Sequence, residues 1–199
     1  AARCRDAWSR GATQLWGIVQ GGFETGLREE SATALQALEL PGYAIGGLSL
    51  GEPGELITGL LRACTEILPA DRPRYLMGVG TEPEMLAAIG AGVDLFDCVW
   101  PTRLARSGAA LVGAGRINLV SSRFARDFDP VEPGCGCPAC TRHCRAEMRH
   151  LVRRGELLGY RLLTAHNLHH TLELVREARR AVLEGRFEQF AGSRSAASV

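Results

Sequence analysis

The strongest constraint on the fold of this chain is a repeated alternation of short apolar runs with amphipathic segments over its first half. Each run ends in glycine or a polar residue, and the segment that follows it has helical spacing of its apolar residues. Repeated strand and helix units predict parallel βαβ connections, so we expect an α/β fold, either a doubly wound sheet or half of a (β/α)8 barrel. The predicted strands are residues 15–22, 42–50, 72–80 and 93–100, and the predicted helices are 27–40, 54–68 and 82–92.

The second half of the chain has a different character. After Pro130 the segment 131–144, "VEPGCGCPACTRHC", is too rich in Gly, Pro and Cys for a regular strand or helix. Two helices broken around Gly159 are predicted to follow over 145–190. The predicted division is therefore βα units over 1–130, a metal-bearing subdomain with C-terminal helices over 131–190, and a disordered tail over 191–199.

Composition excludes several classes of protein. With 46% hydrophobic and 23% charged residues among 199, the chain is neither disordered nor membrane-spanning in character. The N-terminus has no apolar signal core, so we expect a cytoplasmic protein. The chain starts without Met, which suggests a piece of a longer protein.

Four cysteines close together indicate a metal site, because thiols in the cytosol stay reduced. Cys135, Cys137 and Cys140 lie within a Gly- and Pro-rich knuckle, and His166 follows at the approach to a helix. Three thiolates and an imidazole complete a tetrahedral, structural zinc site. Spacing alone also leaves room for Cys144 or for His143, His169 or His170 as ligands, and for reduced cysteines that only pack.

Glycine-rich segments end the first three predicted strands, in "QGG", "GGLSLGEP" and "MGVG". Their order is not that of a Walker loop or a dinucleotide fingerprint, and each alone is compatible with a tight turn. Together they would let a planar heterocycle approach backbone groups closely. Gln20 adds a side-chain amide that can both donate and accept.

Two acids, Asp94 and Asp97, lie in the fourth predicted strand, within "GVDLFDCVWPTR". Strand residues three apart point to opposite faces, so these acids are not a cooperating pair. One should be structural and bond a backbone group or an arginine. Asp97, nearer the end of the strand, is the better candidate for chemistry, since a carboxylate can attack an anomeric carbon, although a simple hydrogen-bond anchor is also compatible.

A basic stretch follows these acids. Between residue 103 and Asp127 the chain has no acid. Phosphate contact and a solvated surface account for this stretch equally well. Its five arginines are Arg103, Arg106, Arg116, Arg123 and Arg126.

Six ordered motifs between residues 15 and 190 resemble the C-terminal half of bacterial tRNA-guanine transglycosylases. They are "LWGIVQGG", "PGYAIGGLSLGEP", "RYLMGVGTEPEML", "GVDLFDCVWPTR", "CGCPACTRHCRAEMRHL" and "ELLGYRLLTAHNLHHTLELV". The resemblance implies the later units of a (β/α)8 TIM barrel with a zinc-binding subdomain. It implies an enzyme of queuosine biosynthesis that exchanges the wobble guanine of GUN-anticodon tRNAs for 7-aminomethyl-7-deazaguanine (preQ1) through a covalent aspartyl-ribosyl intermediate.

The resemblance also assigns residues. Asp97 matches the nucleophile, and Glu52 matches an acid that supports the Gly47–Leu48 peptide. Leu50 is larger than the residue usual in the family, which favours the bacterial base preQ1 over queuine. The base pocket would comprise Gln20, Gly46, Gly47, Leu48, Glu52, Met77 and Gly78; the RNA contacts Arg103 and Arg106; the zinc ligands Cys135, Cys137, Cys140 and His166.

Two further expectations follow from the resemblance. Bacterial members form homodimers, and their other essential aspartates belong to an N-terminal half, so we expect this polypeptide alone to be inactive and poorly stable. The alternative is a non-catalytic, zinc-containing tRNA-binding or dimer-partner subunit of the same family. Such a subunit would be expected to lose the nucleophile, whereas Asp97 is present.

Overall fold

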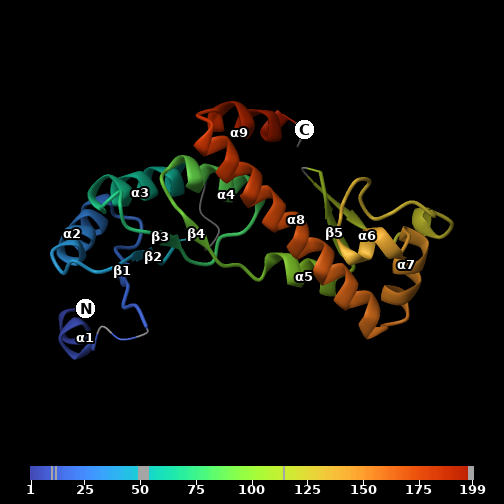
Figure 1. Cartoon of the computed structure of the whole chain (residues 1–199), viewed down its shortest axis with the longest axis horizontal. Coiled ribbons are helices and arrows are strands. Elements are labelled where there is room, and N and C mark those ends of the chain that lie inside the picture. The colour runs from blue at the N-terminus through green and yellow to red at the C-terminus, as the bar shows by residue number, and fades with distance from the viewer. Residues whose placement is uncertain (10, 12, 49–53, 114, 197–199) are drawn as a thin grey trace. The chain divides into compact units, whose positions relative to one another are not determined.

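The computed structural model describes the chain except residues 10, 12, 49–53, 114 and 197–199 (Figure 1). It divides into two compact units, Ala1–Cys98 (unit 1) and Val99–Val199 (unit 2). The boundary predicted after residue 130 marks a change in composition, from the βα units to the Gly-, Pro- and Cys-rich segment. The assignment of residues 1–130 to a barrel stays a prediction. The structural division comes earlier because the segment after Val99 packs with the C-terminal helices.

Unit 1 is a parallel sheet of four strands in the order β1-β2-β3-β4, with a helix after each of the first three. The predicted alternation of strands and helices is therefore confirmed, and the sequential order suits neighbouring strands of a barrel, although four strands close none. The strands are β1 (Gly17–Val19), β2 (Tyr43–Ile45), β3 (Arg74–Leu76) and β4 (Leu95–Phe96); the helices are α1 (Ala2–Ala7), α2 (Thr25–Gln36), α3 (Gly54–Ile67) and α4 (Glu82–Gly90).

The strands are shorter than predicted because glycines bend the backbone soon after each of the first three. Gly21, Gly47 and Gly78 all have positive φ, at 149°, 69° and 79°. The backbone thus leaves the ladder at the carboxyl ends of β1, β2 and β3. All three residues of β2 are buried, whereas Ile18 in β1 and Leu95 in β4, the two edge strands, are about half exposed.

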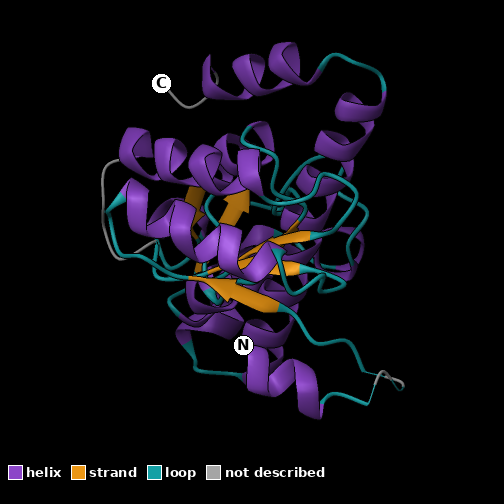
Figure 2. Ribbon diagram, turned by 90° about the vertical axis from the view of Figure 1, so that its left-hand side faces the viewer, coloured by secondary structure: helices purple, strands orange, loops and turns teal. Residues whose placement is uncertain are grey.

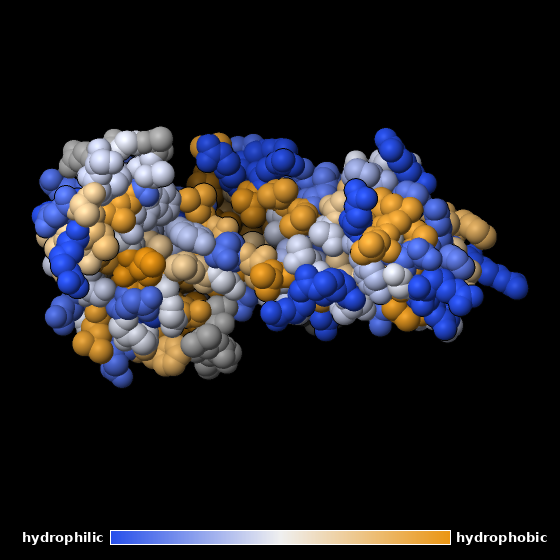
Figure 3. Space-filling view, turned by 90° about the horizontal axis from the view of Figure 1, so that it is seen from below, coloured by the Kyte–Doolittle hydropathy of each residue, from blue (hydrophilic) through white to orange (hydrophobic). Residues whose placement is uncertain are grey.

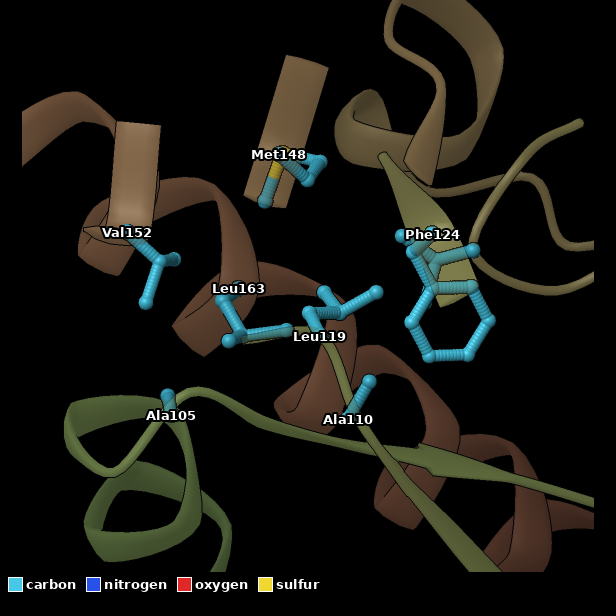
Figure 4. Close-up of a cluster of buried hydrophobic side chains, with 8 residues drawn as sticks. Ala105, Ala110, Leu119, Phe124, Met148, Val152 and Leu163 are labelled. Atoms are coloured by element: carbon cyan, nitrogen blue, oxygen red, sulfur yellow. The ribbon is translucent and has the colours of Figure 1, made fainter. Parts of the chain in front are cut away.

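Unit 2 consists of a β-hairpin and helices. Figure 2 colours the helices of the whole chain purple and its strands orange. Its core is a cluster of buried side chains drawn from the hairpin region and from α5, α7 and α8 (Figure 4). The cluster comprises Ala105, Ala110, Leu119, Phe124, Val131, Met148, Val152 and Leu163. The elements are α5 (Trp100–Arg106), β5 (Ala109–Val112), β6 (Gly115–Asn118), a 3₁₀ turn η1 (Ser122–Phe124), α6 (Pro138–Arg142), α7 (Arg145–Arg153), α8 (Leu157–Leu183) and α9 (Phe187–Ala196).

Four sequence predictions for unit 2 need correction. The segment 131–144, predicted to hold no regular helix, contains the short helix α6, for which Pro138 provides a suitable first residue. Trp100 begins helix α5 and does not end a strand, since Pro101 suits a first helical turn. The helices of 145–190 break at residues 154–156, where Gly155 adopts a φ of 72°, and not at Gly159. Residues 191–196 of the expected tail are helical, as part of α9.

Gly159 lies inside α8 because α7 packs directly against it. A Cβ at this position would lie 2.7 Å from Leu151 Cβ and 3.0 Å from Val152 N. We expect Gly159→Ala to lower the free energy of unfolding by about 1–3 kcal/mol through overpacking. Thermal unfolding measures this, with Gly192→Ala in α9 as the control, because a Cβ there meets nothing within 4 Å. Equal melting temperatures for the two variants would contradict the close contact.

Exposed apolar side chains occur in both units, and the face in Figure 3 shows orange areas among the blue ones. In the described part of the chain no helix has the length and apolarity required to cross a bilayer. The most exposed large apolar residues are Phe128, Leu157 and Leu183, at 78%, 77% and 72%.

Candidate active site and metal centre

Asp97 follows β4 and is held by two donors from the neighbouring strand segment. Its Oδ1 accepts hydrogen bonds from the Tyr75 hydroxyl at 2.6 Å and from the Gly78 N–H at 2.9 Å. The Tyr75 bond, followed by the Gly78 bond, lowers the pKa of Asp97. Asp97 is exposed, so it is an ionised, fixed and accessible carboxylate.

Asp94 has the structural role that strand alternation predicts for one of the two acids. Its Oδ2 accepts the backbone N–H of Arg74 at 2.9 Å, and its own N–H donates to the Arg74 carbonyl at 2.9 Å. The two acids therefore bond different partners. Tyr75, by contrast, was not identified from the sequence; the signal available was a phenol in the strand adjacent to that of Asp97.

The predicted base-pocket residues follow the carboxyl ends of adjacent strands. The Gln20 amide lies against Gly46 and Gly47: an added Cβ would be 2.6 Å from Gln20 Nε2 at the first and 2.7 Å from Gln20 Oε1 at the second. A Cβ at either position would displace this amide, and Gly47 also has a φ of 69°, in the left-handed region that favours glycine. The Gly78 N–H does not face Gln20; it donates to the Asp97 carboxylate.

The other predicted pocket residues differ in exposure. Leu48 is buried and Met77 is 37% exposed. Glu52 and Leu50 lie outside the described residues. The surface at the ends of β1, β2 and β3 thus combines backbone groups with one side-chain amide, which suits an edge-on polar heterocycle.

Two arginines predicted to contact RNA, Arg103 and Arg106, lie on α5 in unit 2, both at least partly exposed. Arg116 in β6, another arginine of the basic stretch, has its Cζ 5.9 Å from the centroid of the Trp100 ring. This geometry is that of a cation–π pair between β6 and the first residue of α5. The contact of Arg103 and Arg106 with RNA stays a prediction.

The metal centre is formed by the four residues that the family resemblance implies. Their ligand atoms lie within 4.8 Å of one another, and in the described chain they are the group of His, Cys and acidic residues placed to hold an ion. His166 Nδ1 lies 3.7, 3.4 and 3.3 Å from the Sγ atoms of Cys135, Cys137 and Cys140. A tetrahedral zinc ion spaces N and S ligands about 3.5 Å apart. The donor set and its spacing therefore fit the metal.

Backbone contacts orient this centre. His166 Nε2 lies 2.7 Å from the Leu111 carbonyl, and only a protonated Nε2 can donate there, which leaves the Nδ1 lone pair facing the thiols. The N–H of Cys140 donates to Cys137 Sγ, and the N–H of Glu132 donates to Cys140 Sγ. Burial raises the pKa of the Cys135 and Cys140 thiols and lowers that of His166.

Two of the alternative ligands, His170 and His143, pair with carboxylates. His170 Nδ1 lies 3.2 Å from Glu132 Oε2, and His143 Nδ1 lies 2.9 Å from Glu147 Oε1. Cys144 precedes α7 as its N-cap. Glu132 and Leu111 support the centre but carry no metal-binding signal in the sequence, because both act through backbone groups: the Glu132 N–H donates to Cys140 Sγ, and the Leu111 carbonyl accepts from His166.

Comparison with known proteins identifies the family of the chain. The family model described as "Queuine tRNA-ribosyltransferase" matches residues 1–198. The chain belongs to this family. A queuine tRNA-ribosyltransferase of Desulforudis audaxviator is 52% identical over 195 residues, which is 96% of this chain and 52% of that protein. One of Thermus thermophilus is 50% identical over 189 residues, 95% of this chain and 49% of that protein.

The chain thus spans about half the length of the curated relatives that it matches. Membership in the queuine tRNA-ribosyltransferase family confirms the resemblance drawn from the six motifs, all of which lie within the matched residues. The relatives carry the name of a transferase that acts on tRNA.

Proposed function

We propose that the protein containing this chain is a tRNA-guanine transglycosylase, which exchanges the wobble guanine of GUN-anticodon tRNAs for preQ1. One observation carries the proposal: an ionised, accessible Asp97 carboxylate lies at the carboxyl end of a parallel strand, fixed by Tyr75 and Gly78. The glycine-rich ends of the neighbouring strands supply a floor for a planar base.

The proposed reaction is a double displacement at the ribose anomeric carbon. An oxygen of Asp97 forms a bond to C1′ as the C1′–N9 bond breaks, and guanine leaves with that electron pair and takes up a proton. The N9 of preQ1 then loses its proton and attacks C1′, which releases the Asp97 carboxylate. Tyr75 and Gly78 hold the carboxylate in place between the two steps.

The base-binding residues of the proposal are Gln20, Gly46, Gly47, Leu48, Met77 and Gly78, together with Glu52, which lies outside the described residues. The Gln20 amide and the backbone at Gly46 and Gly47 provide donors and acceptors for a purine-like edge. Leu50, also outside the described residues, is proposed to leave too little space for the ring of queuine.

The metal of the Cys₃His centre is proposed to be a structural Zn²⁺. When bound it supplies a closed tetrahedral link with no open position for substrate. Cys135, Cys137 and Cys140 come from the knuckle around α6, and His166 comes from α8, so the ion joins two segments of unit 2. Arg103 and Arg106 are proposed to contact the tRNA backbone, and the complete protein is proposed to close a barrel and form a homodimer.

An exchange assay tests the proposal. The complete protein in which this chain occurs is incubated with a GUN-anticodon tRNA transcript and radiolabelled guanine, then with excess preQ1. We expect label to enter the tRNA and to be displaced by preQ1. Binding of the tRNA without incorporation of guanine would contradict the proposal and favour a non-catalytic subunit.

A further inference from the structure

Arg28 is an unusual residue for the interior of unit 1. It lies in α2, is 0% exposed and is among the largest fully buried side chains of the chain. Its hydrogen-bond partners in the described part of the chain are carbonyl oxygens: Nε donates to Gly22 at 2.7 Å, and Nη2 to Gly46 at 3.1 Å and Gly47 at 3.4 Å. The acceptors follow β1 and β2, where the proposed base pocket lies.

If Arg28 only stabilised the fold of unit 1, a buried guanidinium bonded to carbonyl oxygens would be a costly way to do so. Burying a cation is costly unless a counterion pairs with it. Cys64 lies beside the guanidinium, but burial raises the pKa of its thiol, so it remains neutral. Arg28 Nη1 is buried and finds no hydrogen-bond partner among the described residues. Arg28 is therefore a buried cation whose partners among the described residues are three carbonyl oxygens and an uncharged thiol.

The two carbonyls at Nη2 belong to consecutive peptide groups. Because a trans peptide is planar, its N–H points opposite to its C=O. A guanidinium that holds the Gly46 and Gly47 carbonyls therefore directs the N–H groups of Gly47 and Leu48 away from Arg28. Among the described residues neither N–H donates to a backbone carbonyl.

Two glycines allow the backbone to approach Arg28 closely. A Cβ at Gly21 would lie 2.7 Å from Arg28 N and 2.8 Å from its Cγ, so the turn after β1 passes directly against the side chain. Gly47, at a φ of 69°, presents its carbonyl to Nη2. On its other side the same residue meets the Gln20 amide.

We propose that Arg28 is a positioning residue for base binding: from behind the pocket it holds the Gly22, Gly46 and Gly47 carbonyls and so aims the Gly47 and Leu48 N–H groups at the base. The proposal rests on the proposed function. Arg28 touches no substrate. The positive charge on the carbonyl side also polarises both peptides, which strengthens their N–H groups as donors.

The test compares Arg28→Met, Arg28→Lys and Arg74→Lys in the complete protein. The measured quantities are kcat, the KM for guanine and the KM for tRNA, with the covalent protein–tRNA complex on denaturing gels and thermal unfolding as further readouts. Arg74 is the matched control, because it also donates to carbonyls, those of Gly92 and Leu68, but from the first residue of β3.

We expect Arg28→Met to raise the KM for guanine by about tenfold or more, as for loss of oriented hydrogen bonds. The KM for tRNA should not change. Arg28→Lys keeps the charge but cannot span the three carbonyls, so its KM for guanine should be intermediate. Arg74→Lys should lower stability without changing the KM for guanine.

Two results would overturn the inference. The first is a wild-type KM for guanine in both Arg28 variants, including the case in which they lose only stability or kcat. The second is a wild-type protein that forms no covalent complex, which would overturn the proposed function as well and is recognised before any variant is compared. If Arg28→Met does not fold, Arg28→Lys decides.

Discussion

Asp97→Asn in the complete protein is expected to abolish the covalent protein–tRNA complex and to reduce guanine exchange on the order of 10⁴-fold or more, as loss of a nucleophile does in other enzymes. The amide is a far weaker nucleophile than the ionised carboxylate. Asparagine Oδ1 can still accept from Tyr75 and Gly78, so the local structure should be retained. Denaturing gels after incubation with tRNA measure the complex, and labelled guanine measures the exchange.

Asp94→Asn is the matched control, with the same chemical change three residues earlier in the chain. Its carboxylate accepts the Arg74 N–H, and an asparagine carbonyl can accept the same bond. This variant should therefore form the complex and exchange guanine at close to the wild-type rate. A complex that persists in Asp97→Asn but disappears in Asp94→Asn would transfer the nucleophilic role to Asp94.

The features that could be predicted from the sequence are those that depend on residues close together in the chain. Alternating apolar runs and amphipathic segments predicted the strand and helix order of unit 1, because each element buries one face of a regular period. The knuckle spacing of Cys135, Cys137 and Cys140 predicted the metal centre for a similar reason: three ligands lie within six residues. Spacing alone favoured His166 only weakly over the other histidines.

The features missed depend on contacts between distant segments. Arg28 lies in an amphipathic helix, where an arginine usually faces water, and its burial follows from carbonyls 6 to 19 residues away. Tyr75 reaches Asp97 only because β3 and β4 are paired. The β5–β6 hairpin was not predicted. Its two strands have four residues each, and they lie in a segment that we interpreted only for its basic charge. Gly159 was taken for a break because a close helix contact and a helix end both favour glycine.

Removal of the metal is expected to unfold much of unit 2. The ion would join α6 to α8, and α8 contributes Leu163 to the buried cluster and Asn167 to bonds with the Leu111 N–H and the Pro101 and Ala109 carbonyls. Binding of structural zinc contributes about 10–16 kcal/mol in zinc-finger peptides at neutral pH, which is comparable to the whole stability of a typical domain, so loss of the ion should unfold the segments that it joins. We expect Cys140→Ser to lose the metal and the hydrogen-exchange protection of α8.

Cys144→Ser provides a control that is matched in chemistry and nearly in position. Cys144 is the N-cap of α7 and lies outside the cluster of four ligands, so this variant should retain one equivalent of zinc by metal analysis and the exchange protection of the wild type. Comparing Cys140→Ser with Cys144→Ser separates the effect of removing a metal ligand from the effect of replacing a nearby thiol. Zinc retained in Cys140→Ser and lost in Cys144→Ser would show that the ligand set includes Cys144. Because the four candidate ligands lie in unit 2 and Asp97 lies in unit 1, a metal-free protein whose unit 1 remains folded should keep the Tyr75–Asp97 contact.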